Sequence, residues 1–414
     1  MGGYLQGRAG GERLTAAKDK GGTDMLRDCA LSSPAFGALL DVWRHRGRAA
    51  AEFRRSGGKT VGCLGGDVPE EYILAGDMLP VRIPPDPESG LGEADKYLEA
   101  CFDPMVRSQF DRIVRGEAAG LCDFLAVSNS TDVLVRLYLY LRELRRSEPE
   151  VPVPPVAFVD WLFTPSRKFQ LANEKTAARF RETAEAWAGR PITDGDVADA
   201  LRLLNGERAA LRRISALRLS PEPRISGTEA LIVTGAGFYM DRGEHARLVL
   251  ALAEEAAAWP VLTGPRVFLS GTEQYDTTVY ELLEGAGAVV AAEDHDCGMR
   301  WFEGDTDPAL PPEKAVAARY MLRSPSPKKA GVFRRVEALC ASARGAGARG
   351  VAVCMDMFEE AASWDFPEQR KALAALGIEA REFSRLPYPA SKDASLKERM
   401  EAFVKELKGG EDRG

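Results

Sequence analysis

The sequence has few of the motifs on which a metal or cofactor is usually assigned. Its seven cysteines are scattered and form no C-x-x-C pair, which excludes a zinc ribbon and a ferredoxin-type cluster loop. Only three histidines are present, which disfavours zinc or iron chemistry based on histidine. A metal in this chain would therefore need ligands that the fold brings together from distant segments.

The sequence also lacks the signals of membranes, export and nucleotide binding. No apolar run approaches the roughly 18 residues that span a bilayer, and the N-terminal stretch has no apolar core of a signal peptide. An odd, scattered cysteine set without an export signal indicates a reducing compartment, so we expect a cytoplasmic protein. A net charge of −7 does not suggest a nucleic-acid surface, and no P-loop is present for ATP.

The 414 residues instead alternate between short apolar runs and helical segments, which predicts an α/β fold. We expect two Rossmann-like lobes, each with a doubly wound parallel sheet, joined by a helical bridging segment. The expected organisation is a mobile N-terminal tail (1–30), a first lobe (31–165), a helical bridge (166–225) and a second lobe (226–414). The expected strands are 59–64, 78–83, 124–128 and 156–161 in the first lobe, and 230–234, 266–269, 288–292, 351–354 and 378–383 in the second.

Two further local patterns carry predictions. Residues 34–55 have the apolar spacing of one amphipathic helix, and Asp67 is a candidate cap for the helix that follows it. The glycine-rich string GAGFYM after residues 230–234 is only weakly typical of a dinucleotide site. It lacks the third glycine of the fingerprint and an acidic residue at the required distance.

Polar side chains gather directly after the expected strand 288–292. They are Glu293, Asp294, His295, Asp296, Cys297 and Arg300. Ligands of open α/β sheets bind in the crevice outside the carboxyl ends of the strands, so this stretch is a candidate site. The string NSTD (129–132) follows strand 124–128 in the same way and places Ser130 at a second strand end.

Three cysteines stand where such an architecture places ligands. Cys101 begins a helix, Cys297 follows a strand and Cys354 ends one. The thiolate is the form that binds metal, and a helix N-terminus stabilises it. The alternative is that each cysteine is a small hydrophobe filling a gap, which is favoured for Cys354 taken alone because it continues an apolar run.

Several segments resemble the 2-hydroxyacyl-CoA dehydratase and benzoyl-CoA reductase family. They are VPEEYILAGDMLPVRI, the segment of Cys101 with its arginine-containing helix, SGTEQYDTTVYELLEGAGAVVAAEDHDCGMRW, and SWDFPEQRKALAALGIEAREFSRLPYP. The order and spacing of the segments match over about residues 61–405. The resemblance implies two Rossmann-like lobes and a [4Fe–4S] cluster held between them by cysteines.

The resemblance also implies a function and partners. A related second subunit pairs with the chain as a heterodimer or homodimer, and a separate ATP-dependent iron–sulfur activator supplies a low-potential electron. The thioester of an acyl-CoA then becomes a ketyl radical, which allows loss of water or reduction of a ring. The protein would hold the cluster dry and close to the thioester.

Cys101 and Cys297 match the cluster cysteines of the family by motif, and Cys354 matches more loosely. Where the family has an N-T-C-D string, this chain has Thr131, so the resemblance places a hydroxyl at a ligand position. Either one iron is open to Ser130, Thr131 or a substrate oxygen, or Thr131 or Asp132 simply caps the next helix. The first alternative predicts that Thr131→Cys raises cluster retention. Candidate catalytic residues are Ser130, Glu293 and Asp294.

Three functions follow from these observations. The first is a cluster-bearing subunit of a 2-hydroxyacyl-CoA dehydratase or benzoyl-CoA reductase type enzyme. The second is a non-catalytic accessory paralogue that keeps the fold and the pairing surface. The third is a cluster-bearing reductase of another small molecule. The substitution at Thr131 separates the first from the second.

Overall fold

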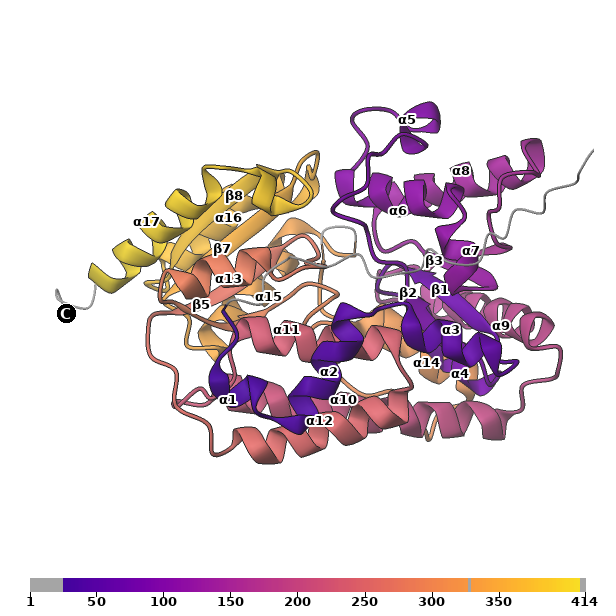
Figure 1. The fold of residues 1–414 in the computed structure, drawn as a ribbon, viewed down its shortest axis with the longest axis horizontal. Helices are drawn as coiled ribbons and strands as arrows, with labels where there is room; N and C mark the ends of the chain where they lie inside the picture. Colours follow the sequence, from indigo (N-terminus) through magenta and orange to yellow (C-terminus); the bar gives the residue numbers. More distant parts are fainter. Residues whose placement is uncertain (1–24, 327–328, 410–414) are drawn as a thin grey trace, which may run out of the picture.

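Two parallel four-stranded sheets organise the chain (Figure 1). The computed structural model describes residues 25–326 and 329–409. The sheet of the first lobe has the order β2-β1-β3-β4 and that of the second lobe has the order β6-β5-β7-β8. The strands are β1 (Thr60–Leu64), β2 (Leu79–Arg82), β3 (Phe124–Ser128), β4 (Val156–Val159), β5 (Arg266–Gly271), β6 (Val289–Glu293), β7 (Gly350–Asp356) and β8 (Glu379–Leu386). The α/β class with two parallel-sheet lobes is confirmed.

The two sheets have the same topology. In each sheet, the first strand in the chain lies between the second and the third. The strand order therefore reverses at β1 and at β5. All strand pairs are parallel, and β1 and β7 are buried along their whole length, as expected of strands covered on both faces. Ligands of doubly wound sheets bind at such reversal points, which directs attention to the loops after β1, β3 and β5.

Helices surround both sheets. The helices before the bridge are α1 (Asp28–Leu31), α2 (Pro34–Arg44), α3 (Arg48–Arg55), α4 (Glu70–Ala75), α5 (Ala94–Tyr97), α6 (Pro104–Val114), α7 (Glu117–Leu121) and α8 (Asp132–Ser147). The bridge and the helices after it are α9 (Arg167–Ala188), α10 (Asp194–Leu219), α11 (Gly227–Ala236), η1 (Gly237–Tyr239), α12 (Arg242–Ala256), α13 (Thr278–Gly285), α14 (Pro312–Leu322), α15 (Val332–Gly345), α16 (Ala361–Ala374), η2 (Ala390–Lys392) and α17 (Leu396–Gly409).

The helical bridge consists of α9 and α10, as the sequence predicts. The side chain of Ser166 accepts a hydrogen bond at the start of α9, and Thr193 and Asp196 form a capping box at the start of α10. Helix α10 has 26 residues, a length of about 39 Å. Its first half adds Leu201 to the core of the first lobe, and its second half adds Ile214 to the core of the second. One continuous helix therefore joins the two cores.

Two other helices cross between the lobes. Helix α2 comes before the first sheet in the chain but lies against α11 and α12 of the second lobe (Figure 1). Helix α14 comes from the second half of the chain but packs against α9, with Val316 in the core of the first lobe. The expected lobes 31–165 and 226–414 each contain one sheet, but each gives a helix to the other lobe. Of the expected tail, residues 1–24 lie outside the described residues, and α1 begins at Asp28.

Two expectations about secondary structure were wrong. Residues 230–234, predicted as a strand, lie in α11, which begins with a capping box formed by Ser226 and Glu229. The whole helix is buried, so its sequence is apolar all round and has no helical stripe. The single helix predicted for residues 34–55 is two helices, α2 and α3, because the backbone leaves the helical conformation at His45.

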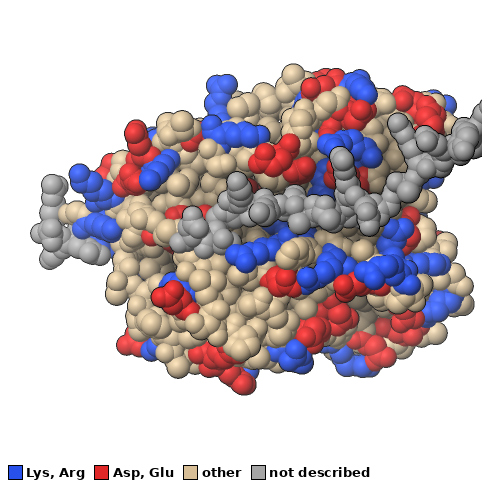
Figure 2. All heavy atoms as spheres, viewed as in Figure 1, with Lys and Arg blue, Asp and Glu red and all other residues tan. Residues whose placement is uncertain are grey.

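Acidic and basic side chains are interspersed over the face shown in Figure 2. Within residues 25–326 and 329–409, we find no helix both long enough and apolar enough to cross a membrane.

Candidate functional site between the lobes

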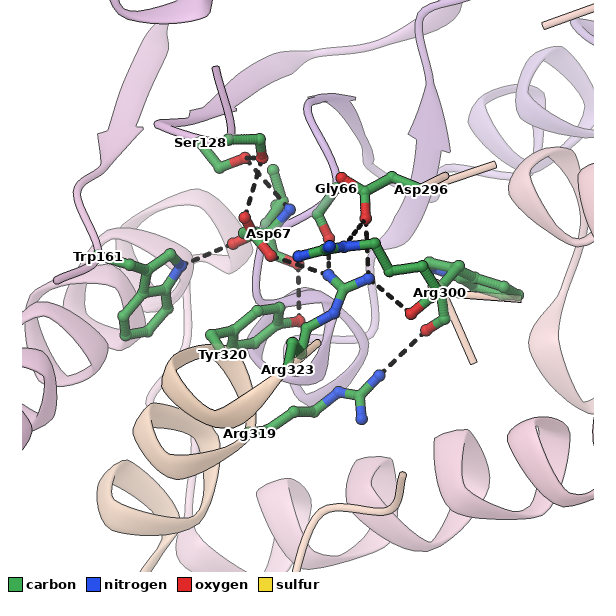
Figure 3. Close-up of polar contacts among 12 residues, drawn as sticks. Gly66, Asp67, Ser128, Trp161, Asp296, Arg300, Arg319, Tyr320 and Arg323 are labelled. Carbon is green, nitrogen blue, oxygen red and sulfur yellow. Dashed lines mark hydrogen bonds and ion pairs between the residues drawn. The ribbon is translucent and has the colours of Figure 1, made fainter. Parts of the chain in front are cut away.

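The loops after β1, β3 and β6 bring polar residues of both lobes together (Figure 3). Asp67 follows β1, Ser128 ends β3 and Asp296 follows β6. Gly65 has φ +88°, a conformation that favours glycine, and turns the chain sharply after β1. A Cβ atom on Gly66 would lie 2.4 Å from Cγ of Asp296, so only glycine lets the lobes approach this closely.

Arg323, which directly follows α14, holds these loops together (Figure 3). Its Nη1 donates to Oδ1 of Asp67 at 2.8 Å and to the carbonyl of Gly66 at 2.6 Å. Its Nη2 donates to Oδ1 of Asp296 at 3.0 Å and to the carbonyl of Arg300 at 2.7 Å. The side chain of Arg323 is only 2% exposed. One buried guanidinium therefore binds carboxylates that belong to different lobes.

Asp67 is the acidic centre of this group on the first lobe. Burial disfavours its ionised form, but the charges of Lys329 and Arg323 outweigh burial and hold its pKa below the usual value. Lys329 forms an ion pair with Asp67, and burial lowers the pKa of Lys329 to about 8 despite that partner. The hydroxyl of Ser130 donates to Oδ2 of Asp67 at 3.1 Å. The prediction that Asp67 caps the next helix was wrong, because α4 begins at Glu70 and has no side-chain cap.

Asp296 is the counterpart on the second lobe. Nε of Arg300 lies 2.8 Å from Oδ1 of Asp296. Burial raises the pKa of Asp296, but Arg300 and Arg323 more than offset this effect and keep it far below the usual range. We call Asp67, Asp296, Arg300, Arg323 and Lys329 the interlobe ion cluster. A cavity of about 10 Å³ beside it, lined in part by Gly66 and Trp301, has room for one water molecule.

Helix α4 adds a second set of buried ion pairs between the lobes. Glu71 pairs with Arg208 of the bridge at 2.9 Å and accepts a hydrogen bond from the hydroxyl of Tyr320 at 2.9 Å. Glu70 pairs with Arg242 of α12 at 2.7 Å. All of these side chains are buried. The interface between the lobes is thus lined with paired charges rather than with apolar side chains alone.

The three predicted catalytic residues occupy different environments. The hydroxyl of Ser130 lies 2.7 Å from that of Ser128 and bonds to Asp67. Glu293 forms a buried ion pair with Arg218 at 2.6 Å, and although burial opposes ionisation, this partner lowers the pKa of Glu293. Asp294 accepts a hydrogen bond from Ser270 at 2.9 Å, and burial raises its pKa to about 6. Glu293 is thus held in an ion pair, whereas Ser130 and Asp294 are held by hydrogen bonds to neighbouring side chains.

Cys297 lies in the turn after β6 and is 2% exposed. Its backbone N–H lies 3.3 Å from Nδ1 of His295, and Nε2 of that ring lies 2.7 Å from the hydroxyl of Tyr280. Burial lowers the pKa of His295 to about 4, so the ring is neutral at pH 7, with Nδ1 as acceptor and Nε2 as donor. Burial and Glu273 raise the pKa of the Cys297 thiol, and the charge of Arg82 opposes them.

The other predicted ligands lie in different settings. Cys101 is exposed and does not begin a helix, contrary to the prediction, because α6 begins at Pro104 after its cap, Asp103. Cys354 is fully buried within β7, in the apolar core of the second lobe. Thr131 caps α8, accepting a hydrogen bond from the N–H of Leu134 at 3.4 Å. In the described ranges, no three or more histidine, cysteine, aspartate or glutamate side chains are grouped so that they could hold a metal ion.

Sequence reasoning did not identify Arg82, Arg323 or Lys329 as site residues. Arg82 ends β2, a strand-end position of the kind that drew attention to Ser130 and Asp294. Arg323 and Lys329 lie after α14, and no local pattern shows that this segment folds back onto the loop after β1.

Two parallel-sheet lobes that meet at the carboxyl ends of their strands define a two-lobed α/β protein with its candidate site between the lobes. Residues 66–407 match the family described as 2-hydroxyglutaryl-CoA dehydratase, D-component. This match covers most of the chain, and the chain belongs to that family.

Two characterised relatives are similar over most of their length. The (R)-phenyllactyl-CoA dehydratase beta subunit of Clostridium sporogenes is 22% identical over 329 residues, which cover 78% of this chain and 85% of the relative. The beta subunit of (R)-2-hydroxyglutaryl-CoA dehydratase of Acidaminococcus fermentans is 24% identical over 339 residues, with 78% and 86% covered.

Proposed function

We propose that this chain is one subunit of a 2-hydroxyacyl-CoA dehydratase complex, which removes water from a 2-hydroxyacyl-CoA. The match to the dehydratase D-component over residues 66–407 carries this proposal. The two relatives are named as beta subunits, so a related partner subunit is part of it. Ring reduction of the benzoyl-CoA reductase type has no comparable support.

Cys101, Cys297 and Cys354 do not form, among the described residues, a group that could hold a [4Fe–4S] cluster. Soft thiolate donors must converge to hold such a cluster. Here one thiol is exposed, one is buried inside β7 and one lies in the turn after β6. Thr131, the fourth predicted contributor, caps a helix with its hydroxyl. We therefore assign the cluster, and the electron delivered by an ATP-dependent activator, to the partner subunit.

In this assignment the chain contributes a rigid framework and polar groups rather than redox chemistry. The interlobe ion cluster fixes the loops after β1 and β6 relative to each other. Asp294, with a pKa raised to about 6, can exchange a proton near neutral pH. In this role the chain is a dehydratase subunit without a cluster of its own, and no observation favours a reductase of another small molecule.

Anaerobic purification of the chain alone, and together with its related subunit, tests the proposal. We expect iron and sulfide in the complex but not in the chain alone after reconstitution, and dehydration of a 2-hydroxyacyl-CoA by the complex with its activator. Cys297→Ser and Cys101→Ser should leave the iron content of the complex unchanged. A full complement of cluster iron in the chain alone, lost in Cys297→Ser, would place the cluster in this chain. An iron-containing complex without dehydratase activity would refute the proposed reaction.

A further inference from the structure

Arg82 is a buried cation without a bonded partner. It is 2% exposed, and neither its Nε nor its Nη1 has a hydrogen-bond partner. No residue in the described parts of the chain accepts a hydrogen bond from its guanidinium group or forms a salt bridge with it. Buried charges are normally paired, because taking a charge out of water is costly unless another group compensates.

The other buried arginines between the lobes show how unusual this is. Arg218, at 1% exposure, bonds both carboxylate oxygens of Glu293 and the carbonyl of Val290. Arg323 has four oxygen acceptors and Arg242 pairs with Glu70. The fold therefore supplies acceptors to neighbouring arginines and leaves Arg82 without any.

Arg82 lies at the carboxyl end of β2 and faces the second lobe. Its Cζ atom is 4.7 Å from the ring centroid of Phe238, a cation–π contact that offsets part of the cost of burial. Its charge acts on Tyr275, Cys297 and Glu273. These three residues follow β5 and β6, so Arg82 stands where the ligand of a parallel sheet is expected, between the strand ends of both lobes.

The charges of two carboxylates, Glu273 and Glu70, act on Arg82, but Glu70 is paired with Arg242. Burial and the charge of Asp296 raise the pKa of Glu273 to about 7, although Arg82 acts in the opposite direction. Glu273 is thus only partly ionised at neutral pH, and no hydrogen bond joins it to Arg82. The side chain of Glu273 is itself partly exposed.

We propose that Arg82 anchors an oxyanion-binding site between the lobes and donates hydrogen bonds to a carboxylate or thioester oxygen of a 2-hydroxyacyl ligand. A guanidinium group suits this role because it stays charged and offers several donors in a fixed plane. The choice of a 2-hydroxyacyl ligand rests on the proposed function, whereas the anion site itself rests on the unpaired donors of Arg82. The ligand is either the free 2-hydroxy acid or its CoA ester, and both carry the required oxygen.

Titration calorimetry on the purified complex tests the site with three probes: (R)-2-hydroxyglutarate, its CoA ester and CoA alone. We expect one of the first two to bind and Arg82→Gln to weaken that binding by about tenfold or more, the loss of a hydrogen bond to a charged group. Arg82→Lys should recover part of the affinity, because it keeps the charge but not the planar fork. Binding of CoA alone should be the same in all variants.

Thermal unfolding without ligand separates this role from a structural one. Arg218→Met should lower the melting temperature, because it strands Glu293. Arg82→Met strands no acceptor, so its melting temperature should equal or exceed that of the wild type. Equal binding of the probes by Arg82→Gln and the wild type, or destabilisation by Arg82→Met as large as that of Arg218→Met, would overturn the inference. A complex that binds through Arg82 but does not dehydrate would refute only the proposed function.

Discussion

Arg323 binds Asp67 across the lobe interface, with Nη1 at 2.8 Å from Oδ1, although 256 positions separate the two residues in the chain. Arg323 follows a helix that belongs to the second half of the sequence but packs in the core of the first lobe. The same side chain reaches Asp296 at 3.0 Å. One buried charge therefore links the loops of both lobes.

Arg323→Met should destabilise the protein strongly. The substitution leaves Asp296 with Arg300 and Asp67 with Lys329, and removes the link between the two pairs. Each carboxylate keeps one cation, but the buried carbonyls of Gly66 and Arg300 lose their donor, which costs about 1–3 kcal/mol for each unsatisfied group and can be measured by urea unfolding. The matched control is Arg212→Met, which breaks an ion pair with Asp305 at 2.9 Å that is largely exposed. Exposed pairs contribute about 0–1 kcal/mol, so an equal loss in both variants would contradict the role given to Arg323.

Gly66→Ala should also disturb the contact between the lobes, at Asp296. The new methyl group would lie 2.4 Å from Cγ of Asp296, a side chain that Arg300 and Arg323 hold in place. Overpacking of this kind costs about 1–3 kcal/mol. Gly206→Ala in α10 is the control, because a Cβ atom there meets nothing within 4 Å. Alanine stabilises a helix interior by about 0.5–1 kcal/mol over glycine, so the two substitutions should change the unfolding midpoint in opposite directions.

Most of the fold could be predicted from the sequence because its strands are short apolar runs between helices. The range 124–128 is predicted to the residue, and the bridge is predicted as two helices. The error at residues 230–234 has a physical cause. A short segment buried on all sides shows neither the period of a strand nor that of a helix, so only the capping box of Ser226 and Glu229 marked it as a helix.

The candidate site was predicted only in part. Polar residues directly after a strand, such as Asp294 and Asp296, are visible in the sequence because the change from apolar to polar is abrupt. Their partners were not, because Arg323 and Lys329 reach them through the packing of α14 against α9. Sequence spacing contains no information about such a contact. The sequence also does not show that Arg82 lacks a hydrogen-bond partner, because this depends on which acceptors the fold places near its guanidinium group.

Asp294→Asn should stabilise the protein more at pH 7.5 than at pH 4.5. Burial raises the pKa of Asp294 from 3.8 to about 6, so the folded protein binds more protons than the unfolded chain between these values. The wild type therefore loses stability as pH rises through this window, by no more than about 3 kcal/mol. Asparagine does not titrate and still accepts the hydrogen bond from Ser270. Chemical unfolding at both pH values measures the difference, and an equal effect at both would show that Asp294 ionises normally.

Thr131 separates the two interpretations of the string NSTD. As the cap of α8, its hydroxyl accepts from the N–H of Leu134, so Thr131→Ala should cost about 1 kcal/mol and Thr131→Ser should cost much less. Thr131→Cys should behave like Thr131→Ala in unfolding and should leave the iron content of the chain unchanged after anaerobic reconstitution. Thr131→Ser is the control in both measurements, because it retains the capping oxygen and adds no thiol. Iron gained by Thr131→Cys alone, with a cluster absorption spectrum, would instead show that position 131 faces a cluster site in this chain.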